Sequence, residues 1–245
     1  MRGTWAIYRR ELAGLFYGPL AWVLLALAFL LNGYLFVLWL KSYSGSVDDA
    51  VQLALGRSWV FWFLLVVVPP LLTMRMVSEE SKSGILEFLL TAPISDASVV
   101  LGKFLAATTF LALLWSSVFL YAAGLASLGV APDLGGLVGG YLGAVLVSGL
   151  FVGVGLFASA LTNTPVLAAF VAVLVNVGIL CAPLLAGLLE NPALRRAIRS
   201  VDVVDHHTNS FLLGVLDSSY VVFFAAWTAL ALFLTVRVIE TRRWA

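Results

Sequence analysis

The sequence predicts an all-α membrane protein with six transmembrane helices, and three observations support this fold class. Of the 245 residues, 62% are apolar and only 11% are charged, whereas soluble domains hold roughly half apolar and about a quarter charged residues. Apolar runs close to the length of about 20 residues that a bilayer crossing needs recur along the whole chain. The charged residues lie almost entirely between these runs, as they do in polytopic membrane proteins.

Composition and motifs also exclude several functional classes. The formal net charge is +1 and no basic run is interleaved with aromatic residues, so we expect no nucleic-acid partner. The single Cys181 cannot form an internal disulfide, and its apolar surroundings favour a packing role. The chain lacks the GxxxxGK(S/T), HExxH and GxSxG motifs. We therefore predict no enzymatic activity, no bound cofactor and no metal site in this chain.

The first 16 residues predict an amphipathic helix at the membrane surface. Trp5, Tyr8, Leu12 and Leu15 recur at helical spacing, with arginines between them. Such a helix can lie in the headgroup region with its apolar face toward the lipid. The alternative interpretation is a positively charged lead-in to the first span.

Six spans follow within a single transmembrane domain. We place them at about residues 20–40, 58–74, 104–128, 139–161, 165–189 and 220–236. The first run is too long for a signal-peptide core and no small-residue cleavage site follows it, so we expect it to be retained. Between the last two spans, residues 190–219 form the longest polar connection.

The distribution of basic residues predicts the orientation in the membrane. With the amino terminus inside, the cytoplasmic set holds nine of the fourteen basic residues: Arg2, Arg9, Arg10, Arg75, Lys82, Lys103, Arg237, Arg242 and Arg243. This bias favours both termini and residues 75–103 in the cytoplasm, and residues 190–219 outside. No charged residue and no histidine falls within the spans as drawn, which argues against an ion-coupled secondary transporter or a proton pump.

The fourth span carries glycines at a spacing of four residues. Gly139 and Gly143 form one such pair, and Gly149 and Gly153 form another. Small residues at this spacing let helices approach closely in lipid, so we predict a packing role for all four and take Ala231 as a lipid-facing position for comparison. The polar residues within the spans could line a substrate path, but interhelical hydrogen bonding is the role we favour. They are Asn32, Thr108, Thr109, Ser116, Ser117, Ser148, Ser159 and Asn176.

Residues 75–103 hold a compact group of charges between two spans, formed by Arg75, Glu79, Glu80, Lys82, Glu87, Asp96 and Lys103. Within this group, residues 85–90 form a short apolar block between Gly84 and a Thr-Ala-Pro sequence that ends at Pro93. The pattern predicts a surface helix of about two turns, stopped because proline disfavours helical geometry in the residue before it. Ser95 and Asp96 can then cap the next helix.

Residues 69–103 resemble, in order and spacing, the cytoplasmic loop after the second span of ABC-2 type permeases, the membrane subunits of ATP-binding cassette transporters. The likeness is greatest to the gliding-motility-type branch, in which a segment similar to His207–Tyr220 leads into the last span. The resemblance implies a coupling helix that docks on a separate ATPase through Glu79, Glu80, Gly84, Ile85, Leu86, Glu87, Thr91 and Pro93.

The resemblance also implies the assembly and its location. Two permease subunits, identical or similar, would lie in a bacterial-type inner membrane above two ATPase subunits that bind and hydrolyse ATP. The expected function is ATP-driven export of an unidentified substrate. The alternative is a non-transporting membrane subunit that drives a periplasmic, motility or envelope-remodelling partner, and residues 190–219 would suit either role.

One group of metal-ligand residue types lies in the connection 190–219, formed by Asp202, Asp205, His206 and His207. Neighbouring histidines point in different directions on a helix, so the two rings do not converge on one ion. We therefore do not predict a metal site there, and the resemblance instead places His207 in the approach to the last span.

Overall fold

The computed structural model describes residues 2–42, 47–82, 95–127, 129–130, 132–187 and 189–243, and every regular element within these ranges is helical. The elements are α1 (Arg2–Tyr17), α2 (Pro19–Ser42), α3 (Val47–Gln52), the π-helical turn η1 (Leu53–Arg57), α4 (Trp59–Thr73), α5 (Ser78–Lys82), α7 (Asp96–Trp115), α8 (Ser117–Ser127), α9 (Leu134–Leu161), α10 (Pro165–Ala186), α11 (Pro192–Arg199), α12 (Val203–Thr208), the 3₁₀ turn η2 (Phe211–Leu213) and α13 (Ser218–Arg243).

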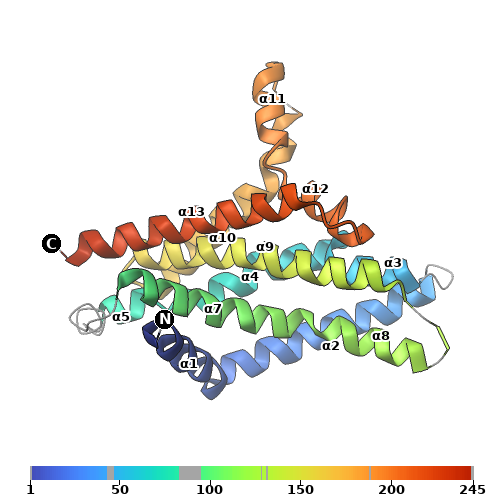
Figure 1. Cartoon of the computed structure of the whole chain (residues 1–245), viewed down its shortest axis with the longest axis horizontal. Helices are drawn as coiled ribbons and strands as arrows, with labels where there is room; N and C mark the ends of the chain where they lie inside the picture. The colour runs from blue at the N-terminus through green and yellow to red at the C-terminus, as the bar shows by residue number, and fades with distance from the viewer. Residues whose placement is uncertain are drawn as a thin grey trace.

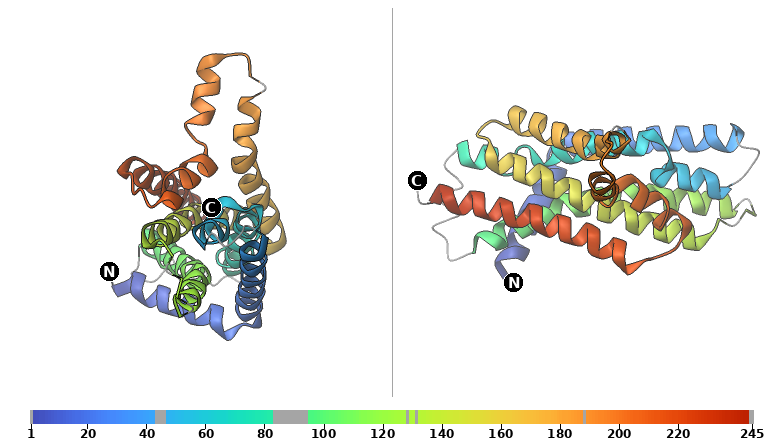
Figure 2. Two further views of the ribbon diagram at one scale, coloured as in Figure 1. Left: turned by 90° about the vertical axis from the view of Figure 1, so that its right-hand side faces the viewer. Right: turned by 90° about the horizontal axis from the view of Figure 1, so that it is seen from above.

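Six segments within the described residues are long and apolar enough to cross a membrane, which confirms the predicted all-α polytopic fold. They are Pro19–Ser42, Val47–Lys82, Asp96–Ser127, Leu134–Leu161, Pro165–Ala186 and Ser218–Thr241. Most of them run along the long axis of the bundle in Figure 1, with α5 and the carboxyl terminus at one end and α3 and α8 at the other. The helix α10 diverges from its neighbours, and together with α11 it projects from the side of the bundle (Figure 2).

The helix α9 lies at the centre of the bundle and packs against α4, α7, α10 and α13. In its most apolar stretch 78% of the residues are buried, compared with 17% in α10 and in α13, which are therefore peripheral. A Cβ added at Gly153 would lie 3.1 Å from Cβ of Ala231. Ala231 is itself only 8% exposed, so the expectation that it faces lipid is wrong: the missing side chain of Gly153 lets α13 approach α9 there.

The helix α1 lies across the bundle (Figure 2), near the end that carries α5. It packs against α7 through Ile7, which is 4% exposed, while Trp5 is 61% exposed. The contact is close because α7 has Gly102 at that position, where an added Cβ would lie 2.7 Å from Cγ2 of Ile7. One face of α1 is therefore buried by protein, and its location in the headgroup region stays a prediction.

The second and third spans extend further into the polar segment 75–103 than we expected. The helix α7 begins at Asp96, where the predicted cap placed the start of the next helix, and this cap is confirmed because the Ser95 side chain accepts a hydrogen bond from the Ser98 amide. The third candidate span therefore starts at Asp96 rather than near residue 104. This extension places Lys103 inside the third candidate span, where it is only 1% exposed. No charged residue falls within the spans as we drew them, but the third candidate span, which begins at Asp96, contains the buried Lys103.

The connection 190–219 is folded in its described part rather than an extended loop. The helix α11 projects from the bundle (Figure 1), whereas α12 and η2 lie against α9. A Cβ added at Gly139 would lie 2.5 Å from the carbonyl oxygen of Phe211, and one at Gly143 would lie 2.6 Å from Cβ of Phe211. These two glycines thus face η2, whereas Gly149 and Gly153 face spans.

Candidate functional site

Four charged side chains from three separate helices meet beside the segment that we expect to couple to an ATPase. Nζ of Lys103 lies 2.9 Å from Oε1 of Glu11 and 2.8 Å from Oε2 of Glu80. Nη2 of Arg10 lies 2.6 Å from Oε1 of Glu11 and 2.7 Å from Oε1 of Glu80. We call these residues, Arg10, Glu11, Glu80 and Lys103, the ionic cluster. It joins α1, α5 and α7.

The ionic cluster is neutral as a whole and buried to different depths. The side chain of Lys103 is 1% exposed, those of Glu11 and Glu80 are 15% exposed, and that of Arg10 is 47% exposed. Burial alone would raise the pKa of Glu11, but the charges and hydrogen bonds of Lys103 and Arg10 outweigh this effect and lower it. Two cations and two carboxylates thus compensate one another, which is the condition for burying an ammonium group.

The cluster holds the chain on both sides of residues 83–94. Glu80 lies shortly before that segment in α5, and Lys103 lies in α7, which begins shortly after it. The α4–α5 junction is also attached to the bundle core, because Oγ of Ser159 accepts hydrogen bonds from the amides of Val77 and Ser78 at 3.2 and 3.1 Å. Both stems of the segment are therefore fixed to α1 and α9 as well as to each other.

The structure describes only part of the predicted coupling set. Glu80 belongs to the ionic cluster and Glu79 is exposed on α5. The other predicted coupling residues lie outside the described residues; they are Gly84, Ile85, Leu86, Glu87, Thr91 and Pro93. Their role stays a prediction.

Sequence reasoning missed Glu11 as a site residue and assigned Lys103 to a loop. One available signal was the charge pattern of α1, in which Glu11 follows Arg10 on a helix expected to lie on apolar surroundings. A second signal was the extension of the α7 pattern back to Asp96, which brings Lys103 two turns into the helix. Glu11 and Lys103 are brought together by the packing of α1 against α7. This tertiary contact cannot be predicted from either segment alone.

Three polar residues of the spans have the interhelical role that we favoured. Oγ1 of Thr109 on α7 accepts a hydrogen bond from the hydroxyl of Tyr8 on α1 at 3.4 Å. Oγ of Ser148 accepts a hydrogen bond from the Trp115 indole at 2.9 Å, which links α9 to α7. Ser159 links α9 to the α4–α5 junction, as described above. Asn176, in contrast, is fully buried on α10 and its side-chain amide has no hydrogen-bond partner among the described residues.

The opposite end of the bundle contains a buried histidine. His207 is fully buried, its Nε2 lies 2.7 Å from the carbonyl oxygen of Leu55, and its ring is parallel to that of Phe61 at 5.3 Å between centroids. Burial lowers its pKa to about 4, although the hydrogen bond to Leu55 opposes this shift. The hydrogen bond assigns the proton to Nε2, so the ring is a neutral donor to Leu55.

The two adjacent histidines have different surroundings. His206 packs on the rings of Tyr220 and Phe223 at centroid distances of 4.8 and 4.6 Å, whereas His207 points into the bundle. Asp202 caps α12 by accepting from the amides of Val204 and Asp205. Within the described ranges no group of three or more His, Cys, Asp or Glu residues could hold a metal ion.

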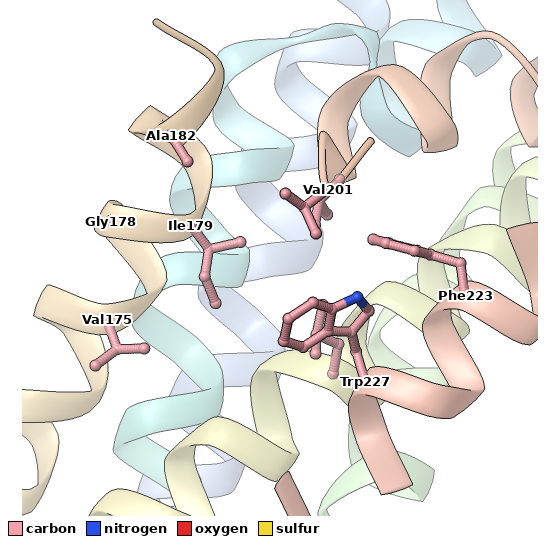
Figure 3. A pocket seen from close by; sticks show the side chains of 9 residues that line it. Val175, Gly178, Ile179, Ala182, Val201, Phe223 and Trp227 are labelled. Atoms are coloured by element: carbon pink, nitrogen blue, oxygen red, sulfur yellow. The ribbon is translucent and has the colours of Figure 1, made fainter. Parts of the chain in front are cut away.

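An apolar cavity of about 340 Å³ lies where α10 diverges from α13. In Figure 3, Val175, Ile179 and Ala182 of α10 stand on one side, and Phe223 and Trp227 of α13 stand on the other. The indole nitrogen of Trp227 is the single polar atom on the labelled side chains. A cavity with so few polar groups can hold an apolar group but cannot orient a polar substrate. The nearby Cys181 is exposed on α10, so the described chain does not show the packing role we expected for it.

The fold and site together define a polytopic helical membrane protein whose second-span junction is locked by ion pairs to a helix lying across the bundle. A family model described as ABC-2 family transporter protein matches residues 40–201. Because that match covers well over half of the chain, the protein belongs to the ABC-2 transporter family and is a membrane component of an ABC transporter. No curated protein matches the chain. The gliding-motility-type branch stays a prediction.

Proposed function

We propose that this protein is the permease subunit of an ABC-2 type exporter, driven through residues 78–93 by a separate ATPase. The ionic cluster is the observation that carries the proposal. It holds both stems of the segment, so a displacement of the segment is passed to α1 and α7 rather than absorbed by a loose linker. The absence of a nucleotide-binding loop from the sequence supports a separate source of ATP hydrolysis.

The composition of the segment suits a docking helix. Its apolar block, residues 85–90, is rimmed by Glu79, Glu80 and Glu87. A partner groove with an apolar floor and a basic edge would match it, with affinity coming mainly from the buried apolar anchors. Because Glu80 is held by Lys103 and Arg10 and Glu79 lines a cavity toward α1 and α2, we assign the outward electrostatic contact to Glu87.

The test is co-purification and ATPase rate of the reconstituted complex for wild type, Gly84→Val and Glu87→Arg. We expect both variants to insert normally but to lose bound ATPase and stimulated turnover, because one misdirects the surface helix and the other sets like charge against the groove edge. Arg237→Glu is the matched control, since it reverses an exposed charge near the same end but outside the segment. Wild-type complex formation and transport in both variants would remove the basis of the proposal.

We further propose that this end of the bundle is cytoplasmic, in a bacterial-type inner membrane, with both termini inside. The excess of basic residues at this end supports this orientation. Ser81 and Ser200 lie at the two predicted sides, so single cysteines at these positions in a Cys181→Ala background report the topology. Only the cysteine at position 200 should react with an impermeant reagent added to intact cells, and labelling at position 81 would contradict the six-span topology.

The projecting α10–α11 arm gives the alternative function a specific basis. Within this arm α10 packs against α4 and α9, whereas α11 projects from the side of the bundle (Figure 1) and would be available to a periplasmic partner or to a second permease copy. Cargo-stimulated ATPase activity in liposomes would favour export. A stable complex with a periplasmic protein that activates the ATPase without any cargo would favour the non-transporting role.

A further inference from the structure

A second cavity, of about 400 Å³, lies between α1, the start of α2 and the junction of α4 with α5. Its size is within the range of pockets that hold small-molecule ligands or part of a larger ligand. The side chains of Tyr17 and Trp22, which are 89% and 59% exposed, flank the turn between α1 and α2 beside it. Aromatic residues at the end of a span mark the membrane–water interface, so we expect the cavity to lie at the depth of the lipid headgroups.

The walls of the cavity change from apolar to charged along the second span. Leu71 and Leu72 come first, Arg75 follows one turn later, and Glu79 and Glu80 follow one turn after that. The charged part is therefore toward the end of the bundle and the apolar part is toward its middle. A ligand that fills such a cavity has a charged head and an apolar body in the same order as a phospholipid in the adjoining leaflet.

The charged side chains that line the cavity determine which phospholipid headgroup it can bind. Glu11 and Glu80 are already compensated by Lys103 and Arg10 within the ionic cluster. Arg75, in contrast, forms no ion pair with any carboxylate of the described chain, although it lines the cavity. A guanidinium at headgroup depth recognises phosphate through paired hydrogen bonds.

We propose that this cavity binds phosphatidylethanolamine from the leaflet at this end of the bundle. The phosphate contacts Arg75, the ammonium group donates to the carboxylates on the α5 side, and the upper acyl chain follows Leu71, Leu72 and Leu20. Leu20 is 41% exposed, so the chain continues from the cavity into the bilayer. This assignment rests on the geometry of the cavity and does not depend on export or on an ATPase.

Other phospholipids fit the charges less well. Phosphatidylglycerol would bring a net negative headgroup without an ammonium group, and outside the ionic cluster the cavity is lined by Glu79 as well as Arg75. Phosphatidylcholine has a quaternary ammonium without N–H donors, so it cannot hydrogen-bond to those carboxylates as a primary ammonium does. The site should therefore prefer ethanolamine to both.

Gly14 provides a way to fill the cavity without disturbing the fold. It lines the cavity, and a Cβ built on it meets no atom within 4 Å. Gly14→Leu therefore projects a side chain into the lipid position. Gly124→Leu is the matched control, because Gly124 is also helical and equally unobstructed but lies on α8. Arg75→Gln removes the phosphate contact, with Arg57→Gln as its control on the opposite end.

The experiment is native mass spectrometry of the full chain, released from detergent that contains equal amounts of the three phospholipids with identical acyl chains. We expect one phosphatidylethanolamine to remain bound to wild type and to both controls. Gly14→Leu and Arg75→Gln should each reduce its retention by about tenfold or more, as loss of one charged hydrogen bond or of the space would do. Thermal unfolding of each variant verifies that it is folded. If Gly14→Leu does not fold, the retention of phosphatidylethanolamine by Arg75→Gln tests the proposal by itself.

Three results would overturn the proposal. Equal retention of all three lipids, unaffected by the variants, would mean annular lipid only. Preference for phosphatidylglycerol would refute the ethanolamine assignment. Full displacement by soluble glycerophosphoethanolamine would show that the headgroup alone is bound and that the apolar wall contributes nothing.

Discussion

The two ends of the bundle each bury a basic side chain, and they do so by opposite means. At one end Lys103, 1% exposed, lies 2.9 and 2.8 Å from two carboxylate oxygens. At the other end His207, fully buried, has a backbone carbonyl and aromatic rings as neighbours. One end keeps the charge and compensates it, whereas the other end removes the charge by deprotonation.

The difference follows from the ordinary pKa values of the two side chains. Neutralising a lysine at pH 7 costs about 5 kcal/mol, whereas neutralising a histidine costs almost nothing because its ordinary pKa is already below 7. A buried lysine therefore requires partners, and here α1 and α5 supply them. The consequence is structural: the charged end is cross-linked between three helices, while the histidine end depends on close packing around a neutral ring.

Removing the buried cation should have the largest effect. Lys103→Met leaves Glu11 and Glu80 facing each other with only the half-exposed Arg10 to compensate them. Breaking a buried ion pair on one side costs about 3 to 5 kcal/mol, which corresponds to roughly 10 °C in melting temperature for a chain of this length. Thermal unfolding in detergent measures it.

Two further variants test whether burial and uncompensated charge cause the loss of stability in Lys103→Met. Arg237→Met removes a cation that is 60% exposed and paired with Glu240 at 2.7 Å; it should change stability by less than about 1 kcal/mol. Adding Glu80→Gln to Lys103→Met should recover part of the loss, since it removes one of the two uncompensated carboxylates. Equal melting of the Lys103 and Arg237 variants would show that depth of burial is not what distinguishes the cluster.

Lowering the pH should weaken the histidine end first. The pKa of His207 is lowered by burial from 6.5 to about 4, so between these values the unfolded chain binds more protons than the folded one. Stability contributed by neutral His207 is present above pH 6.5 and is lost as the pH falls toward 4. Over that window the free energy of unfolding should fall by up to about 3 kcal/mol.

The comparison that isolates this effect is wild type against His207→Gln, unfolded at several pH values across the window. The variant should start less stable but lose less on acidification. The lowered pKa of Glu11 makes its own contribution disappear only at lower pH, below its ordinary value of 4.5, and it does so in both proteins. Parallel pH profiles for the two proteins would show that His207 does not titrate in this window.

The glycines of α9 should differ in how well they tolerate substitution by alanine, and Gly143 and Gly149 are the two positions that test this. A Cβ at Gly143 would lie 2.7 Å from Nδ1 of His207 and 2.6 Å from Cβ of Phe211, whereas one at Gly149 would lie 3.5 Å from the Phe104 ring. Gly143→Ala should cost about 1 to 3 kcal/mol by overpacking. Gly149→Ala should be neutral or stabilising by up to about 1 kcal/mol, since alanine is the better helix former. Unfolding of both variants at pH 7 provides the measurement, and equal effects would contradict the assigned contacts.

The fold was predictable because apolar length alone identifies spans in a chain of this composition. Span ends were less predictable: a helix cap at Ser95 and Asp96 was predicted, but residues 96–103 were still counted with the cytoplasmic loop because the third span was drawn only from residue 104. The charge of Lys103 is tolerated there because Glu11, more than 90 residues away in sequence, is brought beside it by the packing of α1 on α7.

The folded part of the connection 190–219 was also beyond sequence reasoning. The glycine spacing of α9 correctly indicated close approach, but the spacing does not say what approaches. At Gly139 and Gly143 the neighbour is the turn η2, and at Gly153 it is α13. His207 was noted for its metal-ligand chemistry, while its actual neighbours are aromatic rings from α4 and η2.

The smallest effect should come from the exposed rim of the ionic cluster. Arg10 contacts the same two carboxylates as Lys103, at 2.6 and 2.7 Å, but its side chain is 47% exposed. Water screens much of the electrostatic stabilisation that the Arg10 side chain contributes, so Arg10→Gln should lower the free energy of unfolding by no more than about 1 kcal/mol.

The effect of salt should distinguish Arg10 from Lys103. At about 1 M salt, where the screening length is about 3 Å, the loss of stability in Arg10→Gln should nearly vanish. The cost of Lys103→Met should persist, because its partners are screened from solvent by α1 and α7. Melting of both variants at low and high salt tests this, and a loss for Lys103→Met that disappears with salt would mean that the cluster behaves as a surface network.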